Sequence, residues 1–139
     1  MTTISRSDAE AREKRIVKFV IPYPRNRAGR LQWTKEYGLN AYWSGKHWAK
    51  RKADADYWHR LVEYEMNRQK VTREPFEVPV VITFFWDDDL DCSNHAAIAK
   101  MIEDSMKGRV LKDDSRKWVV GIEHYFGAGG VIGVVVKEA

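Results

Sequence analysis

The pattern of apolar and polar residues predicts two well-defined strands in the first two thirds of the chain. Residues 15–21 (RIVKFVI) are rich in β-branched and aromatic side chains, and Pro22 and Pro24 close the segment, so we expect a strand there. Residues 76–86 (FEVPVVITFFW) are apolar on both faces, which predicts a strand that is at least partly covered on both sides. Pro79 favours an edge or a bulge in its first half.

Two further strand candidates lie near the end of the chain. Residues 116–126 form the first, which Gly121 interrupts, and residues 131–137 form the second. The run GAGG at 127–130 joins them, and a short glycine-rich connection between two strands is typical of a tight turn. We therefore expect these two strands to form a C-terminal β-hairpin.

Apolar residues at helical spacing predict one long helix and one short helix. The long helix begins near Ser44 or Gly45 and ends near Gln69, and its apolar stripe comprises Trp48, Ala55, Trp58, Leu61, Val62 and Met66. The short helix covers residues 93–107, with Asp91 or Ser93 as its N-cap and Gly108 as the residue that ends it. Its buried stripe comprises Ala97, Ile98, Met101, Ile102 and Ser105.

This order of elements defines the fold class as α+β. We expect one domain over residues 15–139, in which a mixed β-sheet carries the long helix, the short helix and the C-terminal hairpin, and a flexible tail over residues 1–14. The chain has no apolar run long enough to span a membrane and no apolar core near its N-terminus, so we expect a cytoplasmic protein without membrane contact. The single cysteine, Cys92, excludes an internal disulfide framework.

Charge is distributed unevenly along the chain. Residues 1–75 hold 17 basic and 9 acidic residues, a balance of +8, whereas residues 76–139 hold 7 and 11, a balance of −4. Residues 23–52 combine basic side chains with interleaved aromatic ones, a mixture that suits phosphates and unpaired bases. The simpler alternative is a solvated loop whose aromatic side chains cover the core. The basic residues that we single out are Arg25, Arg27, Arg30, Lys35, Lys46, Lys50 and Arg51.

Carboxylates gather at both ends of the short helix. Four aspartates lie at positions 87, 88, 89 and 91, and Asp113 and Asp114 follow the helix. Like charges at this density repel one another unless solvent or a cation neutralises them. Hard oxygen ligands of this kind suit a divalent cation such as Mg²⁺.

The short helix itself adds a cation and a further carboxylate. At 100° per residue, Ser93, Lys100 and Asp104 fall within about 40° of one another along one flank. Such a set could hold one or two Mg²⁺ ions that generate a hydroxide, while Lys100 offsets charge on a phosphate transition state. The alternative is an acidic loop beside an ordinary Lys100–Asp104 ion pair at i, i+4.

The order of these residues resembles the RusA-type Holliday-junction resolvases, a family of crossover junction endodeoxyribonucleases that phages and prophages often encode. The resemblance covers residues 86–120, where the matching residues are Asp89-Leu90-Asp91, Asn94, Lys100, Asp104, Gly108 and Asp113-Asp114. It extends weakly to LNAYWSGKHW, where Asn40 joins the candidate DNA contacts. It implies an α+β homodimer that binds four-way DNA junctions and makes paired nicks with Mg²⁺, or with Mn²⁺ in its place, in DNA recombination and repair.

The resemblance also implies roles for individual residues. It gives Asp91, Lys100 and Asp114 as catalytic, and Asp89, Asp91, Asp113 and Asp114 as metal ligands, with Ser93, Asn94 and Asp104 in support. In the family the aspartate pair runs directly into the asparagine, whereas Ser93 precedes Asn94 here. Two registers follow, in which the pair is either Asp91 with Ser93 or Asp89 with Asp91. The alternative function is a branched-DNA-binding protein that has kept the fold and lost its activity.

Overall fold

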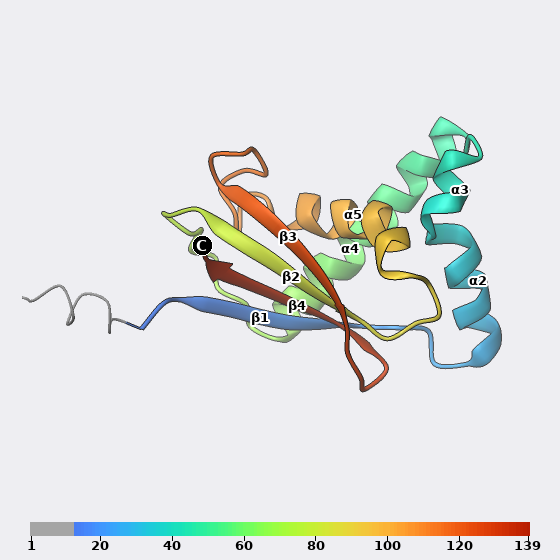
Figure 1. Ribbon diagram of the computed structural model, residues 1–139, viewed down its shortest axis with the longest axis horizontal. Helices are drawn as coiled ribbons and strands as arrows, with labels where there is room; N and C mark the ends of the chain where they lie inside the picture. Colours follow the sequence, from blue (N-terminus) through green and yellow to red (C-terminus); the bar gives the residue numbers. More distant parts are fainter. Residues whose placement is uncertain (1–12) are drawn as a thin grey trace, which may run out of the picture.

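The computed structural model describes residues 13–139 and shows a four-stranded mixed sheet with helices (Figure 1). The strands are β1 (Ile16–Pro22), β2 (Val80–Trp86), β3 (Val119–Phe126) and β4 (Val131–Glu138). The helices are α2 (Arg27–Tyr37), α3 (Leu39–Trp43), α4 (Trp48–Arg68) and α5 (Ala96–Met106), and the 3₁₀ turn η1 (Cys92–His95) precedes α5. The predicted α+β class is confirmed, while the predicted tail lies outside the described residues, except for its last two.

The order of strands in the sheet is β1-β4-β2-β3, so the predicted C-terminal hairpin is wrong. β4 pairs antiparallel with both β1 and β2, and β3 pairs parallel with β2 on its other side. The connection at 127–130 therefore passes across the end of β2, where the Gly127 N–H donates to the carbonyl of Trp86 (2.8 Å). A strand that is apolar on both faces is favoured at the centre of a sheet, and β2 takes that place.

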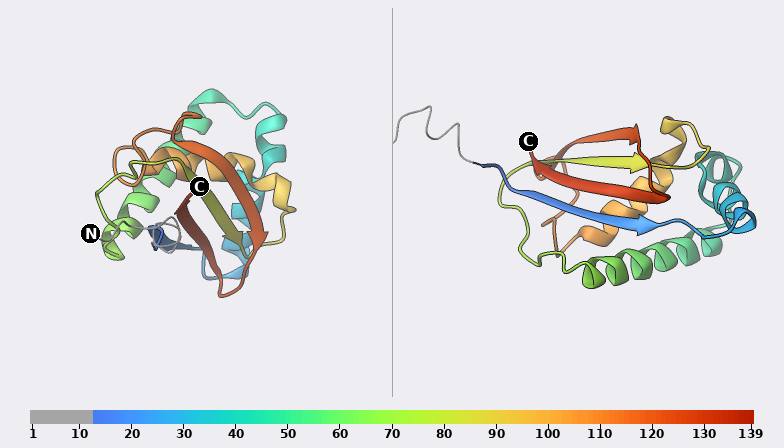
Figure 2. Two further views of the ribbon diagram at one scale, coloured as in Figure 1. Left: turned by 60° about the vertical axis from the view of Figure 1, so that its left-hand side comes forward. Right: turned by 90° about the horizontal axis from the view of Figure 1, so that it is seen from below.

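One face of the sheet carries α4 and α5, and the core lies between these two layers (Figure 2). Alternate residues of β2 and β4 point into it, and the stripe of α4 meets them with Trp58, Val62 and Met66. The predicted long helix is confirmed, although it begins at Trp48 rather than at Ser44 or Gly45. Two residues of its predicted apolar stripe, Trp48 and Ala55, are exposed, so that part of the prediction is wrong. Among residues 13–139, no helix has the length and apolar character that crossing a bilayer requires.

Residues 23–43 contain two helices, α2 and α3, that the apolar pattern does not predict. The Asn26 side chain accepts a hydrogen bond from the Gly29 N–H (2.6 Å) and caps α2, and Gly38 ends this helix in extended backbone. Gly45 has a φ of +81°, which lets the chain turn from α3 towards α4. The helices α2 and α3 lie together at one end of the sheet (Figure 1).

The predicted short helix consists of two parts. Cys92–His95 form the 3₁₀ turn η1, and the α-helix begins only at Ala96. Ser93 therefore lies in a 3₁₀ turn, to which the α-helical angle of 100° per residue does not apply. Gly108 follows the helix with a φ of +83°, as predicted.

Candidate functional site

One ammonium group contacts three carboxylates on α5 and the loop that follows it. Lys100 forms ion pairs with Glu103 (3.3 Å), with Asp104 (3.1 Å) and with Asp114. Lys107 approaches Asp104 and Asp114 at 3.6 and 3.5 Å. We call Lys100, Glu103, Asp104 and Asp114 the acidic cluster. The structure thus brings together three residues that the sequence singles out, Lys100, Asp104 and Asp114, and adds Glu103.

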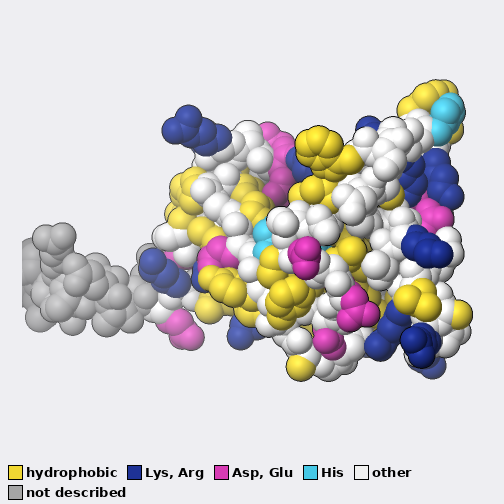
Figure 3. All heavy atoms as spheres, turned by 45° about the vertical axis from the view of Figure 1, so that its right-hand side comes forward, with side chains coloured by type: hydrophobic (Ala, Val, Ile, Leu, Met, Phe, Trp, Pro, Cys, Tyr) yellow, Lys and Arg dark blue, Asp and Glu magenta, His cyan; other side chains and the backbone are white. Residues whose placement is uncertain are grey.

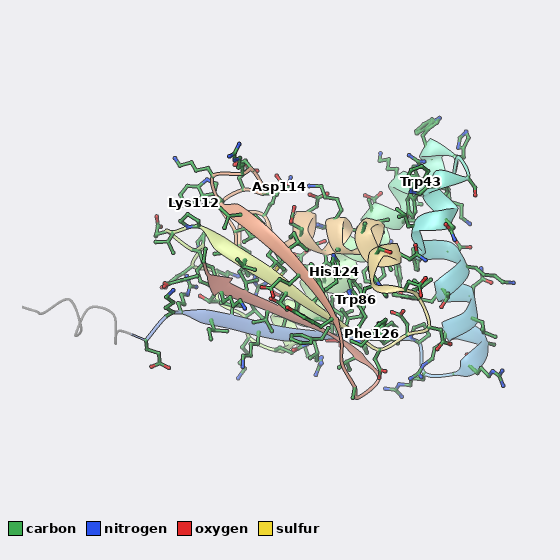
Figure 4. The ribbon with its side chains drawn as sticks, viewed as in Figure 1. Trp43, Trp86, Lys112, Asp114, His124 and Phe126 are labelled. Atoms are coloured by element: carbon green, nitrogen blue, oxygen red, sulfur yellow. The ribbon has the colours of Figure 1, made fainter. Side chains whose placement is uncertain are left out.

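A tight turn brings Asp114 to the helix. Gly108 reverses the chain, and its N–H donates to the carbonyl of Leu111 (2.7 Å). Val110 and Leu111 are buried beneath the turn and fix it to the core. Asp114 follows on the loop that leads from α5 to β3 (Figure 4). The position of Asp114 is therefore set by apolar burial rather than by its own ion pair.

The charged groups of the acidic cluster shift one another's pKa values. Hydrogen bonding from Lys100 holds the pKa of the Asp114 carboxyl well below its usual range, and the same contact raises the pKa of Lys100. Burial raises the pKa of the Glu103 carboxyl, and Lys100 counteracts part of that rise. At neutral pH, Asp114 is consequently ionised and Lys100 protonated.

Two of the four aspartates after β2 serve the structure of the loop. Asp87 accepts a hydrogen bond from the Gly130 N–H (2.7 Å), which ties the loop to the β3–β4 connection. Asp88 accepts from the Tyr23 hydroxyl through Oδ2 (2.6 Å) and from the Leu90 N–H through Oδ1 (2.9 Å). His95 Nε2 lies 2.8 Å from Oδ1 and 2.9 Å from Oδ2. Burial opposes ionisation of Asp88, but the hydrogen bonds from His95 and Tyr23 outweigh it and lower its pKa.

A layer of aromatic rings supports this loop from the core. The buried ring of His95 stacks on Trp86, with 4.1 Å between the ring centroids. The Trp86 indole N–H donates to Nδ1 of His124 (3.0 Å), and burial lowers the pKa of that histidine (Figure 4). The loop is therefore held at its start, through Asp88, and at its end, through His95.

Replacing Tyr23 with phenylalanine should lower the free energy of unfolding by about 1–3 kcal/mol. The hydroxyl accepts from the Asp87 N–H (3.0 Å) and donates to Asp88, and both partners would remain in a buried site without it. Urea unfolding would measure the change. The matched control is Tyr125→Phe, whose exposed hydroxyl donates to Glu123 and whose loss should change stability by less than about 0.5 kcal/mol. Equal effects would contradict a structural role for Tyr23.

The remaining predicted site residues lie outside the acidic cluster. Among residues 13–139, the carboxylates close enough to share one metal ion are those of Glu103, Asp104 and Asp114. Asp91 is exposed at the N-cap position of η1, without a capping hydrogen bond from its side chain. The others are Asp89, Ser93 and Asp113, which are exposed, and Asn94, which is half-buried and donates its backbone N–H to Asp91.

A groove of about 460 Å³ separates α2 from the aspartate loop. Three arginines and three aspartates line it, namely Arg25, Arg27, Arg30, Asp87, Asp88 and Asp89, and Tyr23 and Trp33 form its aromatic part. The guanidinium groups provide donors of the kind that bind phosphate in pairs. Arg30 also donates through Nε to the Pro24 carbonyl (3.0 Å), which orients this side chain.

The other predicted DNA contacts fall into two groups. Lys46 is engaged inside the protein, because its side chain is 8% exposed and forms ion pairs with Asp54 and Glu36. Lys50 is exposed and pairs with Glu36 (3.3 Å). Arg51 is exposed and donates to the Tyr42 carbonyl (2.8 Å). Lys35 and Asn40 are exposed on α2 and α3. All of the predicted contacts except Lys46 are accessible to a ligand.

Sequence reasoning missed Glu103, Lys107 and the histidine that supports the loop. Glu103 lies three residues after Lys100, and this spacing alone could have indicated their contact. Glu103 was missed because it lies between Ile102 and Ser105, which belong to the predicted apolar stripe. Lys107 stands three residues after Asp104 and could have been found in the same way. Nothing in the sequence near His95 indicates its pairing with Asp88.

Comparison with known sequences identified no relative: no protein-family model matches the chain, and no curated protein matches it. The resemblance of the acidic motif to RusA-type resolvases therefore stays a prediction.

Proposed function

We propose that this protein is a Mg²⁺-dependent endonuclease that resolves four-way DNA junctions by paired nicks. The observation that carries the proposal is the acidic cluster, in which Lys100 lies against carboxylates from α5 and the following turn. Three of its members, Lys100, Asp104 and Asp114, also belong to the motif that resembles the RusA-type family. An accessible cation beside a set of carboxylates suits metal-assisted phosphodiester hydrolysis.

The donor set fits a hard divalent cation. One oxygen from each of Glu103, Asp104 and Asp114 lies within 4.8 Å of the others, and Mg²⁺ prefers carboxylate oxygens. When bound there, the ion would supply an activated water and offset charge on the scissile phosphate. Asp114 can contribute a charged oxygen, because its lowered pKa keeps it ionised at neutral pH. We propose Asp89, Asp91 and Asp113 as further metal ligands.

Lys100 has a separate role in the proposed reaction. Its side chain is more than half exposed, so a phosphate can reach the ammonium group. Its pKa is raised by Asp114 and the neighbouring carboxylates, so it stays protonated and stabilises charge that develops on the phosphate oxygens. It acts by its charge and hydrogen bonds rather than as a base.

In this proposal the DNA strands are bound by the cations of α2, of the segment just before it and of the first turn of α4. The arginines of the groove and the exposed Lys35, Lys50 and Arg51 neutralise phosphates, which predicts affinity that falls steeply with salt. Two copies related by a twofold axis would present two acidic clusters to a junction that has the same approximate symmetry. The proposal therefore includes a homodimer.

A labelled four-way junction, incubated with and without Mg²⁺, tests this function. We expect paired nicks with Mg²⁺ and none in the presence of a chelator. Lys100→Met should reduce the cleavage rate by about 100-fold and change junction affinity little, because the lost charge acts on the transition state. The matched control is Lys112→Met, since Lys112 is exposed and pairs with Glu77 outside the acidic cluster. Cleavage without a divalent ion would contradict the proposal.

One observation favours a second function, that of a branched-DNA-binding protein without activity. Lys100 and Lys107 already form ion pairs with carboxylates of the acidic cluster. Asp91, a predicted catalytic residue, lies outside the cluster. Such a protein would bind a four-way junction equally well with and without Mg²⁺ and would leave it intact. The same assay, run with a panel of other branched and single-stranded substrates, separates the two functions.

A further inference from the structure

Two tryptophans stand exposed at the corner between α3 and α4. Trp43 is 77% exposed and Trp48 is 72% exposed, whereas Trp33, Trp58 and Trp86 are buried. Tryptophan provides a large apolar surface, and leaving two of these rings in water has no benefit for the fold. Neither ring packs against the core, so the structure gives them no role in stability.

The corner that carries these rings is held firmly from inside. Below it, Lys46 pairs with Asp54 and lies over the ring of Tyr42, with 4.9 Å between Nζ and the ring centroid. Arg51 donates to the Tyr42 carbonyl, which fixes the first turn of α4 to the end of α3. The Ser44 N–H donates to the Asn40 carbonyl (3.0 Å) and closes α3. The two rings are therefore presented on a rigid support.

The surroundings of the rings are positively charged. Residues 44–52 contain Lys46, Lys50, Arg51 and Lys52 and no acidic residue. Of these cations, Lys50, Arg51 and Lys52 are exposed. Figure 3 shows hydrophobic side chains and a histidine at this projecting corner, with lysine and arginine side chains beside them. Figure 4 shows Trp43 at the outer end of α3.

We propose that Trp43 and Trp48 stack on unpaired bases of DNA, with phosphates bound by Lys50, Arg51 and Lys52. The ligand is DNA that has unpaired bases or opens them at a branch point. Flat rings beside cations suit a nucleic acid, since each base offers a face for stacking and each phosphate a negative charge. This inference rests on the proposed binding of DNA but not on cleavage, and it explains why the corner projects beyond the sheet.

Binding measured without a divalent ion tests the inference separately from cleavage. Fluorescence anisotropy would compare a duplex that contains an unpaired bubble with a fully paired duplex of the same length. We expect Trp43→Ala and Trp48→Ala each to weaken binding to the bubble by about tenfold, and to change duplex binding by less than about threefold. Trp43→Phe and Trp48→Phe, which keep a flat ring, should retain most of the affinity.

The control is Tyr64→Ala, which removes another exposed aromatic ring from α4, one that is 62% exposed and far along the helix from the corner. It should leave binding to both DNAs unchanged. Unchanged bubble binding in both alanine variants would overturn the inference, and so would an equal loss for bubble and duplex. A change in self-association instead would assign the corner to a protein contact and also overturn it. If the cleavage proposal fails, junctions stay intact while the preference for the bubble persists.

Discussion

Replacement of Asp114 with asparagine should reduce Mg²⁺-dependent cleavage of a four-way junction by at least about 100-fold. Asp114 is the carboxylate whose pKa is lowered most clearly, and it has two roles in the proposed site: it is a proposed metal ligand and it forms the ion pair with Lys100. Asparagine keeps the shape of the side chain and removes its charge. The cleavage rate under single-turnover conditions would measure the effect.

Asp113→Asn is the matched comparison for this substitution, and it should reduce cleavage less than Asp114→Asn, because Asp113 is proposed only as a further ligand and lies outside the acidic cluster. Asp113 is the neighbouring residue, its side chain is exposed, and within residues 13–139 it forms no ion pair. The two variants change the net charge equally, so a general weakening of DNA binding or of folding would affect both alike. Loss of activity in Asp113→Asn together with full activity in Asp114→Asn would contradict the site as proposed here. It would assign the metal ligand to the other aspartate of the pair.

Stability should change little in Asp114→Asn. The turn is fixed by buried Val110 and Leu111, and exposed ion pairs contribute at most about 1 kcal/mol. Thermal unfolding of the variant would check this. A rise in stability on adding Mg²⁺ to the wild type, and its absence in Asp114→Asn, would show binding at the acidic cluster independently of activity.

The long helix could be predicted because it has a periodic apolar side, and the central strand because it is apolar on both faces. In α4, Trp58, Val62 and Met66 lie at helical spacing and all three are buried. The helix α2 buries only Trp33 and so has no stripe to recognise. The pairing of β3 with β2 could not be read from the turn, because the choice of a partner strand depends on the whole sheet.

The candidate site was predictable where its residues are neighbours on one helix. Lys100 and Asp104 are four residues apart, and α-helical geometry alone brings them together. The aspartates after β2 could not be distinguished in the same way. Asp88 is bound by Tyr23, which lies 65 residues away in the chain, whereas Asp89 is exposed. Their different roles come from tertiary contacts that local sequence does not encode.

Replacement of Asp54 with asparagine should lower the free energy of unfolding by about 3 kcal/mol. Asp54 is 6% exposed and neutralises Lys46, whose side chain is also buried. The sequence suggests that Lys46 binds DNA, but the structure shows its charge inside the protein. Without Asp54, the ammonium retains the Glu36 carbonyl (2.7 Å) and a longer contact to the Glu36 carboxylate (3.4 Å). These contacts replace only part of the lost attraction.

Asp56→Asn on the same helix is the matched control, because Asp56 is exposed and its replacement should change stability by less than about 0.5 kcal/mol. Urea unfolding of both variants would give the difference. The double variant Lys46→Met with Asp54→Asn should recover part of the loss, since it removes the unpaired buried charge together with its partner. If the double variant were as unstable as the sum of its single changes, the cost would lie in packing rather than in the ion pair. The corner with Trp43 and Trp48 is built on this pair, so Asp54→Asn should also weaken binding to bubble DNA, whereas Asp56→Asn should not.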